Sequence, residues 1–359
     1  MCLMRDLLNK DIKQYSLVEY ILLFLMIFSF IPGVSICGAG GLAFSYFIFF
    51  SLYWIVLVTL FNYCNGKVGG VHNKIHLLRY LFYAVCFISI ATVLWTFVNY
   101  GTLYTSGITS NEIYTVRMQW CEKDIPIVVR YIMANSYNIL CVLLIFLLEK
   151  KAYFSACLIV IIQYINFCCG ANKVIVWGTC ICLLIYSCKK IITIKSIMQA
   201  LYSLIIIGFI LLELNVSDIG VNFMRRMMFV PNILSFEYYD YIINSNGVID
   251  GAVIPYEIGK IYYGNSNNNA NTGLFGDAMR IYGLWGIILQ PLLWCGYLCL
   301  LKLLSTNISY TTLMVIGILW ANVMCESPIA TSMLSHGGVA LIVMLVCIPR
   351  VNRNLNQHL

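Results

Sequence analysis

The sequence predicts an all-α protein whose helices cross a membrane several times, and two observations support this fold class. First, 61% of the 359 residues are hydrophobic and only 10% are charged, whereas soluble domains carry about 25% charged residues. Second, apolar runs of roughly eighteen or more residues recur along the chain, and each can cross a hydrocarbon core of roughly 30 Å. Helices suit lipid because they satisfy their own backbone hydrogen bonds.

We expect about ten membrane-spanning helices in one membrane domain that covers residues 1–359. The N-terminal stretch is basic and leads into an apolar run with no small-residue cleavage site, so we interpret it as an uncleaved first helix. The expected spans are 17–36, 41–63, 77–99, 126–148, 152–169, 172–188, 196–215, 274–301, 309–325 and 333–349.

Two connections between these spans are longer than turns. Residues 100–125 form a short outer loop, and residues 216–273 form a large one. Loops much beyond about 12–15 residues are usually functional or disordered. The large loop is rich in Tyr, Ile, Phe and Val, so we expect it to contain short helices and to carry function.

The distribution of charge predicts the orientation of the chain. With the N-terminus placed in the cytoplasm, the cytoplasmic side holds 14 basic and 4 acidic residues, and the outer side holds 8 basic and 11 acidic residues. Basic residues in short loops favour the cytoplasmic side, which predicts that both termini are cytoplasmic. The net charge of +7 is mainly this orientation signal, so it gives no reason to expect a nucleic-acid partner.

Five cations are expected at the outer surface, where basic residues are disfavoured. They are Arg117, Lys173, Arg225, Arg226 and Arg280. Each one alone is compatible with snorkelling, in which the stem lies in lipid and the charge lies among headgroups. As a set they suit an anionic ligand, because the guanidinium fork matches phosphate geometry.

Carboxylates accompany these cations in the sequence. Asp277 and Arg280 are three residues apart, so on a helix they share a face and can pair. A charged pair where an apolar helix begins is costly in lipid, so we expect it to face the protein interior or a wet cavity. Asp277, Asp240 and Glu237 are candidate general bases, and each could equally be a solvated acid or an arginine partner.

Tyrosines give the large loop a flat, amphipathic surface. Tyr239, Tyr256 and Tyr263 suit contact with sugar rings, and Tyr is also common at membrane interfaces. The sequence has no nucleotide-binding lysine loop and no HExxH zinc motif. Most of the 16 cysteines lie in apolar spans, where a thiol acts as a small hydrophobe. We therefore expect no metal and no cofactor.

Several segments resemble the O-antigen and capsule repeat-unit polymerases, the Wzy family. The large loop and the helix after it carry this resemblance in RRMMFVPNILSFEYYDYI, PYEIGKIYYG and NANTGLFGDAMRIYGLWGIIL. The short segments NEIYTVR and GANKVIVWG are also similar to parts of these proteins.

The resemblance implies a glycosyltransferase of the bacterial inner membrane with a GT-C-like architecture. Its substrates would be undecaprenyl-diphosphate-linked oligosaccharides, which it would polymerise into O-antigen or capsule with release of undecaprenyl diphosphate. Its partners would be these glycolipids, the membrane lipids and a chain-length regulator. Arg226 and Arg280 would act at the reaction centre with Asp277, Asp240 and Glu237, while Arg117, Arg225 and Lys173 would bind substrate.

Two other functions in the assembly of glycans remain open at this point, as does a purely structural or partner-binding role in the membrane. An O-antigen ligase shares the architecture and the donor, but it usually carries a His in the large loop, and residues 216–273 contain none. A lipid-linked oligosaccharide flippase is the non-enzymatic alternative, although a large outer loop is not typical of one.

Overall fold

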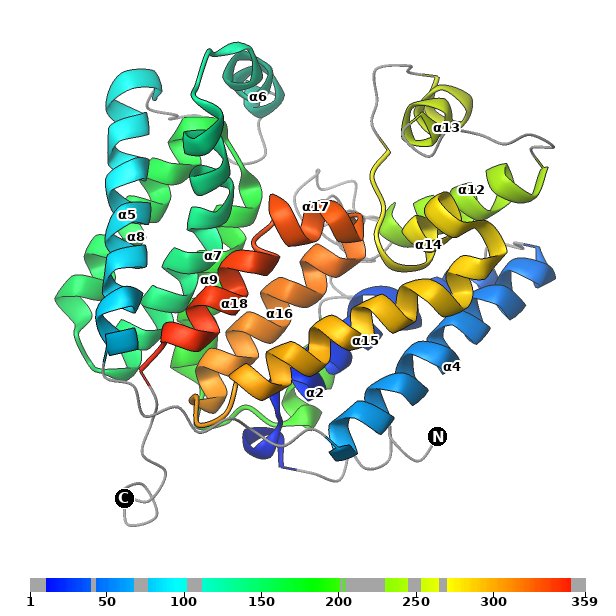
Figure 1. Ribbon diagram of the computed structural model, residues 1–359, viewed down its shortest axis with the longest axis horizontal. Coiled ribbons are helices and arrows are strands. Elements are labelled where there is room, and N and C mark those ends of the chain that lie inside the picture. The colour runs from blue at the N-terminus through cyan, green and yellow to red at the C-terminus, as the bar shows by residue number, and fades with distance from the viewer. Residues whose placement is uncertain are drawn as a thin grey trace.

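The computed structural model describes residues 11–39, 43–67, 77–101, 112–200, 203, 230–244, 253–264 and 270–349. Every regular element within these residues is a helix (Figure 1). Among the described residues, seven helices or helix runs are long and apolar enough to cross a membrane. The expected all-helical class is therefore confirmed, and the seven apolar helices fit a multi-pass membrane protein.

The elements follow one another along the chain with short connections between most of them. Their bounds are η1 Ile12–Gln14, α2 Leu17–Leu25, η2 Met26–Phe30, α3 Ile31–Ala39, α4 Phe44–Lys67, α5 Leu77–Tyr100, α6 Glu112–Glu122, α7 Ile127–Glu149, α8 Tyr153–Gly170, α9 Lys173–Cys188, α12 Val230–Asn244, α13 Ile254–Tyr263, α14 Leu274–Tyr282, η4 Gly283–Trp285, α15 Gly286–Leu304, α16 Tyr310–Glu326, α17 Ile329–Leu334 and α18 Gly338–Cys347.

Nine of the ten expected spans fall on helices of the structure, but two of these expected spans are divided. The expected span 333–349 is interrupted between Leu334 and Gly338, where Gly337 has a φ of +97°, and the expected span 274–301 is described below. Two of these nine, α9 and α16, have 16 and 17 residues and fall short of the length that crosses a bilayer unaided. The expected span 196–215 lies outside the described residues, apart from 196–200 and 203. Inside the expected short loop, α6 forms a helix.

The expected continuous span 274–301 differs from the structure, which divides this stretch into α14 and α15. The break falls at Gly283, whose φ of +56° lies in a region that glycine adopts far more readily than other residues. A single 3-10 turn follows and leads into α15. This break was not predicted from the sequence because the residues on both sides of Gly283 are apolar.

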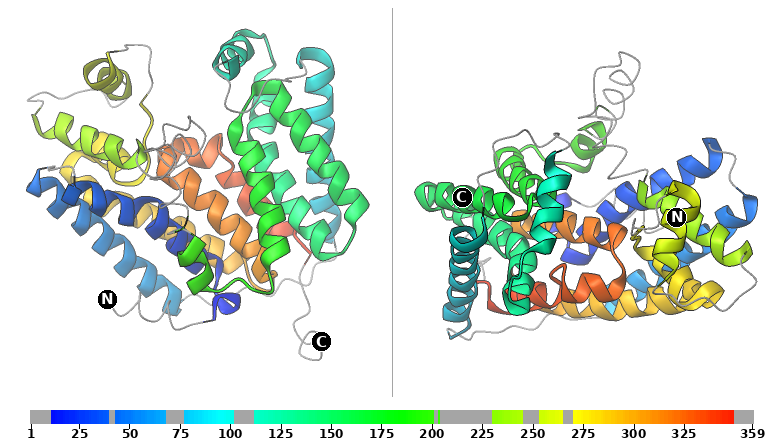
Figure 2. Two further views of the ribbon diagram at one scale, coloured as in Figure 1. Left: turned by 180° about the vertical axis from the view of Figure 1, so that it is seen from behind. Right: turned by 90° about the horizontal axis from the view of Figure 1, so that it is seen from above.

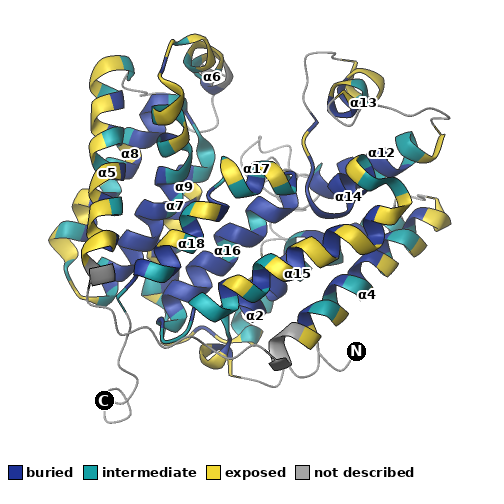
Figure 3. Cartoon of the chain, viewed as in Figure 1, coloured by how far each residue is buried: buried dark blue, intermediate teal, exposed yellow. Residues whose placement is uncertain are grey.

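The helices form two packed groups joined through the middle of the molecule (Figure 1). In one group, α7 packs against α5, α8 and α9. In the other, α2 packs against α16 and α4 packs against α15. The two groups meet where α16 contacts α7 and α9 and where α18 contacts α5, α7 and α15. Figure 3 shows α16 as largely buried, whereas α5 and α15 each keep an exposed face.

The contact between α2 and α16 depends on a small residue. A Cβ atom at Gly317 would lie 2.6 Å from the Cβ of Tyr20, so glycine allows the two helices to approach closely. The N-terminus of α2 is fixed by a capping box, in which the Ser16 and Glu19 side chains each accept a hydrogen bond from the other's backbone N–H.

The short helices that lie outside the long bundle gather at one end of the molecule. Figure 1 shows α6, α12, α13, α14 and α17 at this end, while η1 and the last residues of α18 lie at the opposite end. Both views in Figure 2 keep α6 and α13 apart, over different helix groups. The large-loop region thus lies above the group formed by α2, α4, α15 and α16.

Candidate functional site

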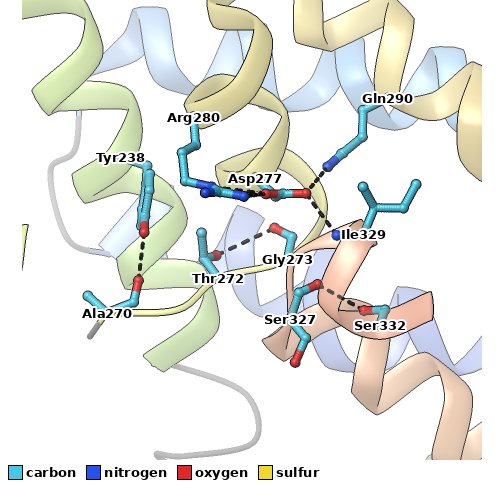
Figure 4. A network of polar contacts seen from close by, with 10 residues as sticks. All are labelled: Tyr238, Ala270, Thr272, Gly273, Asp277, Arg280, Gln290, Ser327, Ile329 and Ser332. Carbon is cyan, nitrogen blue, oxygen red and sulfur yellow. Dashed lines mark hydrogen bonds and ion pairs between the residues drawn. The ribbon is translucent and has the colours of Figure 1, made fainter. Parts of the chain in front are cut away.

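The candidate site is built by α12, α13 and α14, together with the segment that enters α14. A small apolar core holds α12 to α13 and to Ala270, and it includes Tyr238 and Ile258. The Tyr238 hydroxyl donates a hydrogen bond of 2.7 Å to the Ala270 carbonyl (Figure 4). This bond ties the start of the α14 segment to α12.

Asp277 lies at the centre of the site and is completely buried. Its Oδ1 accepts hydrogen bonds from Nη2 of Arg280 at 2.7 Å and from Nε at 3.1 Å. Its Oδ2 accepts bonds from Nε2 of Gln290 at 2.9 Å and from the backbone N–H of Ile329 at 3.0 Å (Figure 4). The expected pairing of Asp277 with Arg280 is present, and this carboxylate joins α14, α15 and α17.

A second hydrogen bond extends this network to α4. The Tyr53 hydroxyl donates to Oε1 of Gln290 at 2.8 Å, and both side chains are buried. A buried carboxylate is tolerable when a cation and several donors surround it. These four donors to Asp277, supported by Tyr53, explain how the chain keeps an acid at the start of an apolar helix.

The segment before α14 is wedged against the end of α16. The Gly273 N–H donates a hydrogen bond of 3.1 Å to the Cys325 carbonyl. A Cβ atom at Gly273 would lie only 1.9 Å from the Met324 carbonyl oxygen, so no larger residue fits here without movement. Gly273 therefore allows the segment before α14 to lie close against the end of α16, and this close contact fixes the position of α14 and Asp277.

Of the five candidate cations, Arg280 is the one that the structure, within the residues it describes, places at this site. Its side chain is 16% exposed, while its carboxylate partner is fully buried. Arg280 also lies near enough to Tyr238 to lower the pKa of that phenol, although burial raises the pKa more strongly. A guanidinium held by a buried carboxylate is preoriented, which is the arrangement that stabilises developing negative charge with little reorganisation.

Glu237 lies on α12, one residue before Tyr238. Its side chain is only 7% exposed, and its Oε2 atom has no hydrogen-bond partner among the described residues. Burial raises the pKa of Glu237 to about 7, and an interaction with the Tyr263 hydroxyl opposes this increase. A carboxyl group that titrates near neutral pH can accept or donate a proton under physiological conditions.

Asp240, the third candidate carboxylate, has its oxygens occupied. It accepts hydrogen bonds from the Tyr262 hydroxyl at 2.6 Å and from the Asn244 amide at 2.8 Å. These bonds link α12 to α13 and stabilise the last turn of α12. The geometry therefore gives Asp240 a structural contribution to this unit.

The three candidate tyrosines have different surroundings. Tyr239 is 3% exposed and its ring packs against Tyr46, Phe49 and Phe275, so it belongs to the core between α12 and α4. Tyr256 and Tyr263 are 45% and 44% exposed on α13. Only these last two present an aromatic surface.

Two other candidate cations, Arg117 and Lys173, lie over the helix group formed by α5, α7, α8 and α9, away from Asp277. Arg117 donates from Nε to the Ala171 carbonyl at 3.1 Å, at the C-terminal end of α8. Lys173 is the first residue of α9 and is half-buried there. Lys123 and Arg130 likewise donate to carbonyls at the ends of α5 and α6. A cation at a helix C-terminus interacts favourably with the helix dipole, so Arg117, Lys123 and Arg130 have a structural explanation. Lys173 lies at the N-terminus of α9, so this explanation does not apply to it.

Arg225 and Arg226 lie outside the described residues. The structure thus brings Glu237, Asp240, Asp277 and Arg280 into one unit of three short helices, and it places Arg117 and Lys173 elsewhere. In the part of the chain that the structure describes, no three His, Cys, Asp or Glu residues group closely enough to hold a metal ion.

Two members of the network were missed in the sequence. Gln290 is a polar residue within an apolar span, and that pattern could have identified it as a partner for Asp277. Tyr53 is far from the site in sequence, and many tyrosines in the chain share its local pattern. The backbone N–H of Ile329 carries no sequence signal.

The fold and the site define a class, namely a multi-pass helical membrane protein with a polar unit of short helices at one end. Comparison with protein-family models, curated proteins and solved structures gave no match.

Proposed function

We propose that this protein is a bacterial inner-membrane glycosyltransferase that polymerises lipid-linked oligosaccharide repeat units into O-antigen or capsular polysaccharide. The growing glycan would be transferred from undecaprenyl diphosphate to a hydroxyl group of a newly arrived lipid-linked unit. The termini would be cytoplasmic, and α12, α13 and α14 would face outward. The substrates would reach these helices from the outer leaflet.

The position of Arg280 carries this proposal. Its guanidinium is partly exposed at the end of a membrane-crossing helix and is oriented by a fully buried carboxylate. The diphosphate leaving group gains negative charge as its bond to the sugar breaks. A preoriented cation at that position would stabilise the transition state more than the substrate.

Asp277 has a supporting role in this proposal. Its carboxylate oxygens accept hydrogen bonds from Arg280, Gln290 and the Ile329 N–H, and its side chain is fully buried. Such a carboxylate can orient a cation, but it is not placed to meet an attacking hydroxyl. Glu237 is better placed to accept the proton, because its Oε2 atom has no hydrogen-bond partner within the part of the chain that the structure describes.

Deleting the gene and separating the surface polysaccharide by gel electrophoresis tests the proposed activity. We expect the ladder of long chains to collapse to a single repeat unit, and plasmid-borne wild-type protein should restore it. Complete loss of attached glycan would instead indicate a ligase or a flippase. An unchanged ladder would contradict any role in assembly of the polysaccharide.

A further inference from the structure

We propose that Glu237 and the exposed face of α13 form the binding site for the acceptor glycan, with Glu237 accepting the proton of the attacking sugar hydroxyl. This inference rests on the proposed polymerase activity and adds a second substrate site to it. Arg280 would hold the donor diphosphate, and the acceptor would bind on the neighbouring pair of helices.

An unsatisfied buried oxygen is the first observation that supports this site. Glu237 is more than nine-tenths buried, yet its Oε2 atom has no hydrogen-bond partner among the described residues. Buried polar atoms nearly always have partners, because an unpaired one loses its interaction with water without replacement. A sugar hydroxyl group is small and can donate the hydrogen bond that this oxygen lacks.

The neighbouring carboxylates do not share this feature. Asp240 accepts hydrogen bonds from Tyr262 and Asn244, and both oxygens of Asp277 accept bonds from protein groups. Of the three candidate carboxylates, Glu237 is the one whose buried oxygen lacks a hydrogen-bond partner among the residues described.

An aromatic face on α13 is the second observation, and it leads to the same carboxylate. Tyr256, Lys260 and Tyr263 are four and three residues apart, so they lie on one face of the helix. All three are exposed, while Ile254 and Ile258 on the opposite side are buried. Tyrosine rings pack well against the apolar faces of sugars and offer a hydroxyl to their polar edges. The Tyr263 hydroxyl also interacts with Glu237, so the aromatic face ends at the buried carboxylate.

The proposed step balances without any additional reactant. The acceptor oxygen forms a bond with the anomeric carbon of the donor glycan, and the bond from that carbon to the diphosphate oxygen breaks. The bonding electrons leave with undecaprenyl diphosphate, and the acceptor proton moves to Oε2 of Glu237. Burial raises the pKa of Glu237 to about 7, so a large fraction of the protein can accept this proton at neutral pH.

Other titratable or charged groups on the elements packed against α12 define the electrostatic setting of Glu237. Among the described side chains they are Tyr238, Tyr239, Asp240 and Tyr241 on α12 itself, Tyr256, Glu257, Lys260, Tyr262 and Tyr263 on α13, Asp277, Arg280 and Tyr282 on α14, Cys37 on α3, and Tyr46, Tyr53 and Tyr63 on α4.

Two measurements on purified protein in nanodiscs test this site. The first is the binding of the free repeat-unit oligosaccharide, released by mild acid from lipid-linked intermediates of the deletion strain and followed by saturation-transfer NMR. The second is the rate of polymerisation of the lipid-linked repeat unit between pH 5.5 and pH 8.5. Glu237→Gln, Glu237→Ala and Tyr256→Ala are compared with Glu257→Gln, an acid-to-amide control on α13.

We expect Glu237→Gln to bind the free glycan within a few-fold of wild type, because the amide retains an acceptor oxygen. Its polymerisation rate should fall by about 10²-fold or more, because an amide cannot accept the proton. Wild-type rates should fall as the pH drops below about 7, and the residual rate of the Gln variant should lack that dependence. Glu237→Ala and Tyr256→Ala should weaken glycan binding by about tenfold, and Glu257→Gln should match wild type in both measurements.

A Glu237→Gln variant that polymerises at the wild-type rate would overturn the proton-acceptor role. Unchanged glycan binding in both Glu237→Ala and Tyr256→Ala would overturn the binding site. Failure of the wild-type protein itself to polymerise would overturn the polymerase function and the proton transfer that depends on it. The binding measurement would still decide whether α12 and α13 hold a glycan.

Discussion

At the scale of single residues, the stability of the protein should depend on Asp277, a buried acid at the start of an apolar helix that is stabilised by several hydrogen-bond donors. We expect Asp277→Asn to lower the free energy of unfolding by about 3 kcal/mol, because it leaves Arg280 without its buried counter-charge. The measurement is thermal or denaturant unfolding in a mild detergent. Gln290→Ala, which removes one donor and keeps the ion pair, should cost less, about 1–2 kcal/mol. Equal stability of Asp277→Asn and wild type would show that the network contributes little.

Sequence spacing could predict half of this network. Asp277 and Arg280 lie three residues apart on one helix, so their pairing follows from helical geometry alone. Gln290 and Ile329 reach the same carboxylate from other helices. Their contribution depends on the break at Gly283 and on the position of α17, and neither is encoded in a local pattern.

Glu237 should make stability depend on pH. Its pKa is raised from 4.5 to about 7 in the folded protein, so the folded state binds its proton more tightly than the unfolded state. The stability linked to the neutral form is fully present below about pH 4.5 and is lost as the pH rises to about 7. Relative to Glu237→Gln, wild type should become progressively less stable across this range. Parallel melting curves at every pH would contradict a buried, titrating Glu237.

At the scale of helices, the entry to α14 is held by a close contact between backbones. We expect Gly273→Ala to destabilise the protein by more than about 2 kcal/mol, because its Cβ atom would overlap the Met324 carbonyl and push α14 outward. Gly296→Ala in α15 is the matched control. A Cβ atom there meets nothing within 4 Å, and alanine favours helix by about 1 kcal/mol. Similar unfolding midpoints for the two variants would contradict the proposed wedge.

The helices themselves were largely predictable, whereas their interruptions were not. The positions of α4, α5, α7 and α8 could be predicted from long apolar runs in the sequence, since only such runs are long enough to cross the hydrocarbon core of a membrane. The division between α14 and α15 depends on Gly283, whose neighbours on both sides are apolar. The short helix α6 was missed because its polar residues resemble a loop.

At the scale of the whole molecule, the proposed orientation predicts which surfaces are accessible from outside. An epitope tag inserted after Gly264, at the C-terminal end of α13, should bind antibody in intact spheroplasts. A tag inserted between Lys151 and Ala152, in the turn from α7 to α8 at the opposite end, should bind only after permeabilisation. The reverse pattern of antibody binding would indicate the opposite orientation in the membrane, with Arg280 on the cytoplasmic side.

The most direct test of the central claim is the rate of glycan polymerisation by purified protein in proteoliposomes supplied with the lipid-linked repeat unit. Wild type should produce a ladder of chain lengths. Arg280→Ala should be slower by about 10²-fold, the usual consequence of losing one preoriented transition-state contact, and Arg280→Lys should recover part of the rate by restoring the charge. The polymerisation rates are compared at equal amounts of folded protein in the membrane. Equal rates for wild type and Arg280→Ala would contradict the proposal that this guanidinium stabilises the departing diphosphate.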